Sequence, residues 1–158
     1  FKPEQIKDEE LDAILEAGTY APTGMGKQSP IMIAVQNKDD IAELERINAE
    51  IFGKPDSNPF YGAPTVIVVL ADADRPTAVY DGSLVMGNLL NAAASVGVDS
   101  CWIHRAKETF EREDGRTLLK KWGIEGNYIG IGNCVLGYAA SSPSPALPRK
   151  TGYITKVK

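Results

Sequence analysis

The sequence predicts a single domain built from both helices and strands, and three observations lead to this class. The chain has 158 residues, which is long enough for one buried core. Its hydrophobic content of 43% and charged content of 24% are ordinary for a globular protein. Apolar residues recur at helical spacing in some segments and form continuous runs in others, which indicates mixed secondary structure.

The first expected elements are a helix and a strand. The helix begins at Asp8, a good N-cap residue, and ends before Pro22, because apolar residues recur at helical spacing between them. These residues are Leu11, Ile14, Leu15 and Gly18. The segment Pro30–Gln36 is nearly all apolar, which predicts a strand.

A second helix and a buried strand are expected next. Lys38–Phe52 is amphipathic, with Ile41, Leu44, Ile47 and Ile51 on one face. A turn-rich stretch at 53–62 follows. Thr65–Leu70 is a continuous run of mainly β-branched residues, so both faces of this strand are expected to be buried at the centre of a sheet.

A long helix over Arg75–Val96 is expected to be buried, because it is apolar on more than one side and rich in small residues. Asp81, Asn88 and Asn91 fall on one face of it. Two interpretations stay open. These side chains either line a polar surface that faces a ligand, or their amides form hydrogen bonds with neighbouring backbone groups.

The last third predicts a strand at Val98–Ile103, a helix at Lys107–Trp122 and a strand at Tyr128–Tyr138. The tail over 139–158 carries Pro143, Pro145 and Pro148 and is expected to be extended. Its end, Thr151–Val157, alternates like an edge strand. This segment either adds a strand to the sheet of a neighbouring subunit or folds back on its own sheet.

Several functional classes have little support. The net charge of −4 and the lack of a basic block argue against nucleic-acid binding. No apolar run approaches the roughly 20 residues that a membrane span needs. Cys101, Cys134 and the single histidine do not make a metal ligand set, and the distant cysteines suit a reducing, cytoplasmic setting.

The loop Ala21–Pro30 is the most informative local feature. Its two glycines and a hydroxyl allow backbone N–H groups to approach a planar or anionic ligand, and Gln28 adds a side chain that can bind a ring edge. A phosphate-binding P-loop is excluded, since Gln28 follows Lys27 and Ala21 stands where a glycine is required. The alternative is an ordinary connection between a helix and a strand.

Three other motifs have competing interpretations. Gly130–Val135 nearly matches a dinucleotide fingerprint, but Val135 replaces the last glycine and a strand follows, so these glycines are expected to serve close packing or a bulge. His104 lacks an identifiable partner for a hydrolytic triad. Arg149 and Lys150 are either a phosphate clamp or a solvated basic pair.

Taken in order, these segments resemble the flavin-dependent nitroreductase family over essentially the whole chain. They are Phe1-Lys2-Pro3, Ala21–Pro30, Gly62–Val69, Gly97–Ile103, and the tail with Gly137-Tyr-Ala and Pro148-Arg149-Lys150. The resemblance implies an α+β fold with a central, mostly antiparallel sheet. It also implies an obligate homodimer, FMN at the subunit interface, and a C-terminal segment that crosses to the partner sheet.

The resemblance implies the site residues as well. Pro22, Thr23, Gly24 and Gln28 would contact the flavin from one subunit, and Cys101, Trp102, Ile103, His104 and Arg105 would line its other side. Arg149 and Lys150 would hold the phosphate, and Asn58 lies near a flavin-contacting position of the family. The protein would then be an NADH- or NADPH-dependent enzyme of one domain, 1–158, that reduces small nitroaromatics or quinones by ping-pong hydride transfer through flavin N5.

The sequence departs from the family pattern at three places. Gly26 stands where asparagine is common and no aromatic residue lies near Pro30, while His104 and Arg105 follow Ile103 where glycine is usual. The family's arginine-rich phosphate-binding segment would precede Phe1, and without it FMN affinity is expected to fall. The alternatives are a flavin-binding sensor or carrier without turnover, or a reductase of enones or halogenated aromatics.

Overall fold

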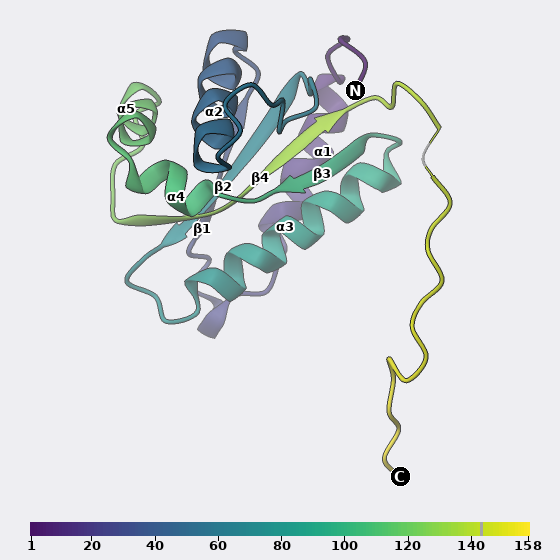
Figure 1. Cartoon of the computed structure of the whole chain (residues 1–158). Helices are drawn as coiled ribbons and strands as arrows, with labels where there is room; N and C mark the ends of the chain where they lie inside the picture. Colours follow the sequence, from purple (N-terminus) through teal and green to yellow (C-terminus); the bar gives the residue numbers. More distant parts are fainter. Residues whose placement is uncertain (143) are drawn as a thin grey trace.

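The computed structural model describes residues 1–142 and 144–158, and it places one antiparallel sheet between two layers of helices (Figure 1). The four strands lie in the order β1-β2-β4-β3. The helices are α1 (Asp8–Thr19), α2 (Lys38–Ile51), α3 (Ala78–Ser95), α4 (Ala106–Glu111) and α5 (Glu113–Lys121). The strands are β1 (Pro30–Val35), β2 (Thr65–Asp72), β3 (Asp99–Ile103) and β4 (Tyr128–Gly137), and a 3-10 turn spans Gly24–Gly26. The expected α+β fold is confirmed.

Strand β2 lies inside the sheet, as its run of apolar residues predicts. It pairs with β1 on one side and β4 on the other, and residues 66–71 are fully buried. Ile67 and Val69 point into the core formed with α1 and α3, whereas Val68 and Leu70 point into the core beside α2 and α4. One continuous apolar strand therefore supplies both hydrophobic cores.

Close packing explains the glycines of β4. A Cβ atom at Gly130 would lie 2.2 Å from the carbonyl oxygen of Ala106, so the start of α4 rests directly on the strand. A register shift opposite Val69 and Leu70 leaves Ile131 as the extra residue of a β-bulge. Both observations confirm the structural interpretation of these glycines over a dinucleotide site.

The predicted helix at Lys107–Trp122 is wrong in one respect, since it forms two helices rather than one. The chain is extended at Arg112, with ψ of 157°, between α4 and α5. Gly115 then packs so tightly that a Cβ atom there would lie 1.9 Å from the Thr109 carbonyl oxygen. Residues six apart in one continuous helix do not approach so closely, so this contact requires a break between α4 and α5. The helical spacing of apolar residues in the sequence does not reveal that break.

The first helix also begins one residue earlier than expected. Lys7, rather than Asp8, is the N-cap residue, and its backbone N–H donates to Glu10 Oε2 at 3.0 Å. A glutamate at the third helical position is well placed for this contact, so the carboxylate of Glu10, and not a side chain at the N-cap, stabilises the start of the helix.

The C-terminal tail leaves the domain and projects away from it (Figure 1). It forms no strand over 144–158, so the expected strand at Thr151–Val157 is absent from the single chain, and folding back on its own sheet is not observed. The side chains of Tyr153, Ile154 and Val157 are between 73% and 93% exposed. Pro145 and Pro148 lie in the extended part, whereas Pro143 lies outside the described residues.

Candidate active site

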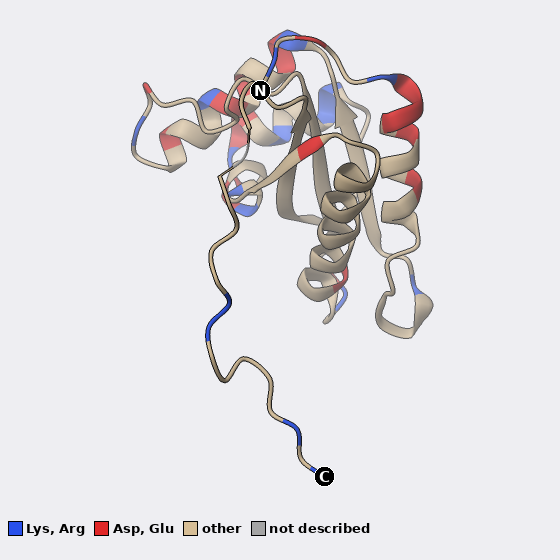
Figure 2. Ribbon diagram, turned by 90° about the vertical axis from the view of Figure 1, so that its right-hand side faces the viewer, with Lys and Arg blue, Asp and Glu red and all other residues tan. Residues whose placement is uncertain are grey.

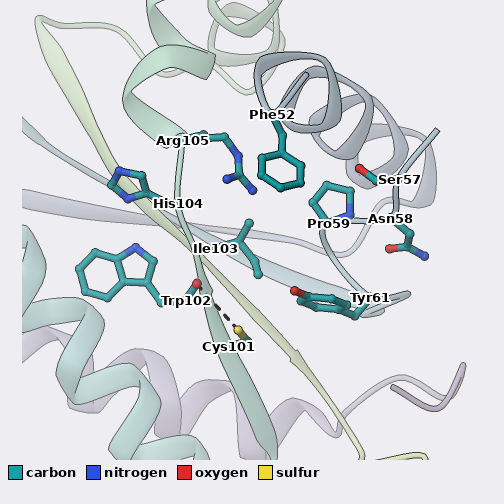
Figure 3. Close-up of a pocket in the computed structure, with 10 residues that line it drawn as sticks. All are labelled: Phe52, Ser57, Asn58, Pro59, Tyr61, Cys101, Trp102, Ile103, His104 and Arg105. Atoms are coloured by element: carbon teal, nitrogen blue, oxygen red, sulfur yellow. Dashed lines mark hydrogen bonds between the residues drawn. The ribbon is translucent and has the colours of Figure 1, made fainter. Parts of the chain in front are cut away.

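A pocket of about 380 Å³ opens beside β3, where that strand ends (Figure 3). One wall is the segment 101–105, and the other is the end of α2 with the loop after it. The lining residues are Phe52, Ser57, Asn58, Pro59, Tyr61, Cys101, Trp102, Ile103, His104 and Arg105. The structure thus brings together six of the residues predicted for the site, Asn58 and the segment 101–105.

The end of β3 is held by a buried amide. Asn48 of α2 is fully buried; its Nδ2 donates to the His104 carbonyl oxygen at 2.9 Å, and its Oδ1 accepts from Arg105 Nε at 3.0 Å. Arg105 adopts a left-handed conformation with φ of 76°, which costs a residue with a side chain about 1–2 kcal/mol. The two hydrogen bonds of Asn48 therefore hold the backbone of His104 and the side chain of Arg105 where they line the pocket.

The thiol of Cys101 stays protonated and acts as an apolar part of the pocket wall. Burial raises the pKa of the Cys101 thiol, and it raises the pKa of Cys134 to about 12. A thiolate nucleophile is therefore not available at neutral pH from either side chain. Within residues 1–142 and 144–158 no cluster of three or more histidine, cysteine or carboxylate side chains is arranged to hold a metal ion.

The loop before β1 is shaped by a buried carboxylate. Asp81 of α3 accepts from the backbone N–H of Gly24 and from the hydroxyl of Thr77, both at 2.9 Å. The hydroxyl of Thr23 accepts from the backbone N–H of Gln28, also at 2.9 Å. These contacts fold the loop over the start of α3 and leave the side chain of Gln28 exposed.

Two of the three polar residues on this face of α3 form hydrogen bonds with backbone groups of the same chain. Asp81 holds the loop, and Asn88 Nδ2 donates to the Ala17 carbonyl oxygen at 2.9 Å. Asn91 is exposed. The second interpretation, an amide that satisfies neighbouring backbone, is confirmed for Asn88, and the carboxylate of Asp81 binds neighbouring backbone as well.

Three groups of predicted site residues lie apart in the single chain. The loop with Pro22, Thr23, Gly24 and Gln28 precedes β1, at one edge of the sheet, whereas the pocket lies along β3 at the other edge. Three strand spacings separate these edges, about 14 Å. Arg149 and Lys150 lie in the exposed tail, where Arg149 donates to its own Leu147 carbonyl oxygen.

Four lining residues were not predicted from sequence, and neither was Asn48. Phe52 was expected only as the last residue of a helix, and Ser57, Pro59 and Tyr61 only as part of a turn-rich stretch. Tyr61 has φ of 57°, so the backbone reverses sharply beside the pocket. A long, irregular stretch between a helix and a buried strand was the one available signal, since such loops often carry binding residues.

The comparison with known proteins decides the family. The sequence profile of the nitroreductase family matches residues 1–138. The chain belongs to the nitroreductase family. Its nitroreductase fold is also found in a Bacteroides fragilis nitroreductase crystallised with bound FMN, which is 31% identical with a TM-score of 0.91. The alignment covers 100% of this chain and 91% of that one.

Two further relatives agree with this assignment. A Desulfitobacterium hafniense nitroreductase with bound FMN is 30% identical, has a TM-score of 0.87, and is matched over 91% of its chain and 100% of this one. An Archaeoglobus fulgidus protein, provisionally named NADH dehydrogenase/NAD(P)H nitroreductase, is 28% identical over 87% of this chain and 77% of its own length. Membership in this family makes the chain an oxidoreductase.

Proposed function

We propose that this nitroreductase-family protein is an FMN-dependent oxidoreductase that uses NADH or NADPH to reduce small electron-poor acceptors such as nitroaromatics or quinones. The observation that carries the proposal is the pocket beside β3, together with the FMN found in relatives that align over the full chain. The name of the archaeal relative supports a nicotinamide co-substrate. When bound, FMN supplies hydride transfer, and the protein supplies binding and orientation.

The pocket residues fit a flavin in shape and chemistry. A volume of about 380 Å³ lies within the usual range of cofactor pockets, and the rings of Trp102, Tyr61 and Phe52 form apolar walls for a planar molecule. Peptide groups at the end of β3 offer N–H donors to a ring edge, which would stabilise negative charge on a reduced ring. Arg149 and Lys150 are the candidate phosphate ligands.

The protein also has to be a homodimer in this proposal, with the whole chain 1–158 as one domain and its tail crossing to the partner. The loop and the pocket lie at opposite edges of one sheet in a single chain. A two-fold axis would bring the loop of one subunit to the β3 pocket of the other, so that both could contact one flavin. The outer face of α3 suits such an interface, because Val79, Tyr80 and Leu84 are about half exposed or more. Figure 2 shows that α3 has almost no charged residues.

The direct test is the visible absorption spectrum of the purified protein, reconstituted with FMN and mixed with NADH or NADPH in the absence of oxygen. We expect a flavin spectrum that bleaches on addition of the dinucleotide and returns on addition of a nitroaromatic or a quinone. A flavin spectrum that no dinucleotide bleaches would instead support a sensor or carrier. A protein that retains no flavin after unbound FMN has been removed would contradict the proposal.

A further inference from the structure

We infer that Arg105 is a specificity residue that binds an anionic oxygen group, a carboxylate or phosphate, of the small molecule entering the β3 pocket. The inference deepens the proposed function, on which it rests. It goes beyond the proposed flavin contacts because it assigns a substrate-binding role to the Arg105 guanidinium.

The guanidinium is held in place from two sides. Its Nε donates to the buried Asn48 amide at 3.0 Å, and its central carbon lies 4.6 Å from the centre of the Phe52 ring. Figure 3 shows it beside that ring, between Phe52 and His104. A side chain fixed by a ring and by an amide loses little further freedom when it binds a ligand.

The charge of Arg105 is not neutralised by the protein. Arg46, Arg75 and Arg112 each form ion pairs with carboxylates, whereas Arg105 has none in the part of the chain that the structure describes. Among the described residues that line the pocket, none is an aspartate or a glutamate. The two terminal nitrogens of the guanidinium also make no hydrogen bond within residues 1–142 and 144–158.

These nitrogens form a planar pair of donors that matches the two oxygens of a carboxylate or phosphate. The left-handed backbone at Arg105 adds a second argument. Glycine would adopt φ of 76° without strain, so the arginine is kept at a conformational cost. Backbone strain of this kind persists only where the surrounding structure holds it, and it clusters at functional sites.

The test compares paired probes in the flavin-loaded wild-type protein and in flavin-loaded Arg105→Gly, a substitution whose relief of backbone strain offsets the loss of the Arg105–Asn48 hydrogen bond. One pair is 4-nitrobenzoate and its neutral counterpart 4-nitrobenzamide, and the other is NADPH and NADH. We expect the ratio of kcat/KM for the more anionic to the less anionic probe to fall about 10- to 100-fold in at least one pair. Which pair responds identifies the source of the anion.

Arg116→Gln is the matched control, because Arg116 is exposed on α5 and donates to the Glu111 carbonyl oxygen, away from the pocket. It removes the same charge and is expected to leave both ratios at the wild-type value. Equal losses for both members of each pair would overturn the inference, as would unchanged ratios. A loss of FMN affinity alone would also overturn it, since the guanidinium would then serve the flavin.

Failure of the proposed function would be visible separately. If the wild-type protein reduced neither acceptor and oxidised neither dinucleotide, titration calorimetry with 4-nitrobenzoate and 4-nitrobenzamide would still test Arg105. Tighter binding of the carboxylate that Arg105→Gly abolishes would support the inference. Equal binding of the two compounds would overturn it.

Discussion

Deletion of Gly152–Lys158 is expected to convert the protein to a monomer that no longer retains FMN. The removed segment contains exposed Tyr153, Ile154 and Val157, and in the single chain it pairs with no strand. A strand added to the partner sheet would bury these side chains. It would also pair the free backbone N–H and C=O groups of the tail with those of the partner's edge strand. Light scattering gives the mass, and the flavin absorbance of the purified protein gives the FMN content.

Two control variants separate the effect of the strand-forming side chains from that of tail length. Replacing the same residues by glycine and serine keeps the length but removes the strand-forming side chains, so it is expected to behave like the deletion. A glycine- and serine-rich extension after Lys158 is expected to leave the dimer intact. If the deleted protein remained a dimer with bound FMN, strand exchange by the tail would be refuted.

Replacement of Arg149 by alanine is expected to weaken FMN binding about 10- to 100-fold, because a charge-assisted hydrogen bond to phosphate contributes about 1.5–3 kcal/mol. The melting temperature without FMN should change little, since among the described residues the Arg149 side chain donates only to the carbonyl oxygen of Leu147 in its own tail. Flavin titration and thermal melts of the same preparations measure the two effects.

Lys158→Ala provides the matched control for Arg149→Ala. It removes one positive charge from the same exposed tail, so any effect of net charge alone should appear in both variants. We expect it to bind FMN as the wild-type protein does. Comparable losses of FMN affinity and of stability in Arg149→Ala would argue against a phosphate clamp at this position.

Sequence patterns predicted the elements of this fold where local spacing determines them. The continuous β-branched run at Thr65–Leu70 favours a strand that is buried on both faces, and this segment forms the interior strand β2. The break at Arg112 depends on a contact between Gly115 and the backbone of Thr109, which is not visible in local spacing. The apolar spacing there correctly predicts that both segments are helical, but it wrongly predicts one continuous helix.

The residues of the candidate site were likewise predictable where they share one sequence segment, and not where long-range contacts bring them together. The segment 101–105 and Asn58 were predicted for the site, and the structure places them around one pocket. Asn48 was missed because a polar residue on an amphipathic helix gives no sign that it is buried against a strand end 56 residues away. The separation of the loop at Ala21–Pro30 from that pocket follows from the strand order, which no local pattern reveals.

The central claim is that each flavin site combines the loop of one subunit with the β3 pocket of the other, and differently tagged heterodimers test it. Gly24→Val displaces the loop, because a Cβ atom there would lie 2.5 Å from the Thr77 hydroxyl oxygen. Cys101→Phe fills the pocket. Each variant alone is expected to form a dimer without FMN.

The measurement is the FMN content of the heterodimer that carries Gly24→Val in one chain and Cys101→Phe in the other. Shared sites predict about one FMN per heterodimer, because two-fold symmetry leaves one site with both halves intact. The control places both substitutions in one chain beside a wild-type partner, and shared sites then predict no FMN. The reverse pattern, with FMN retained only in the control, would contradict the account.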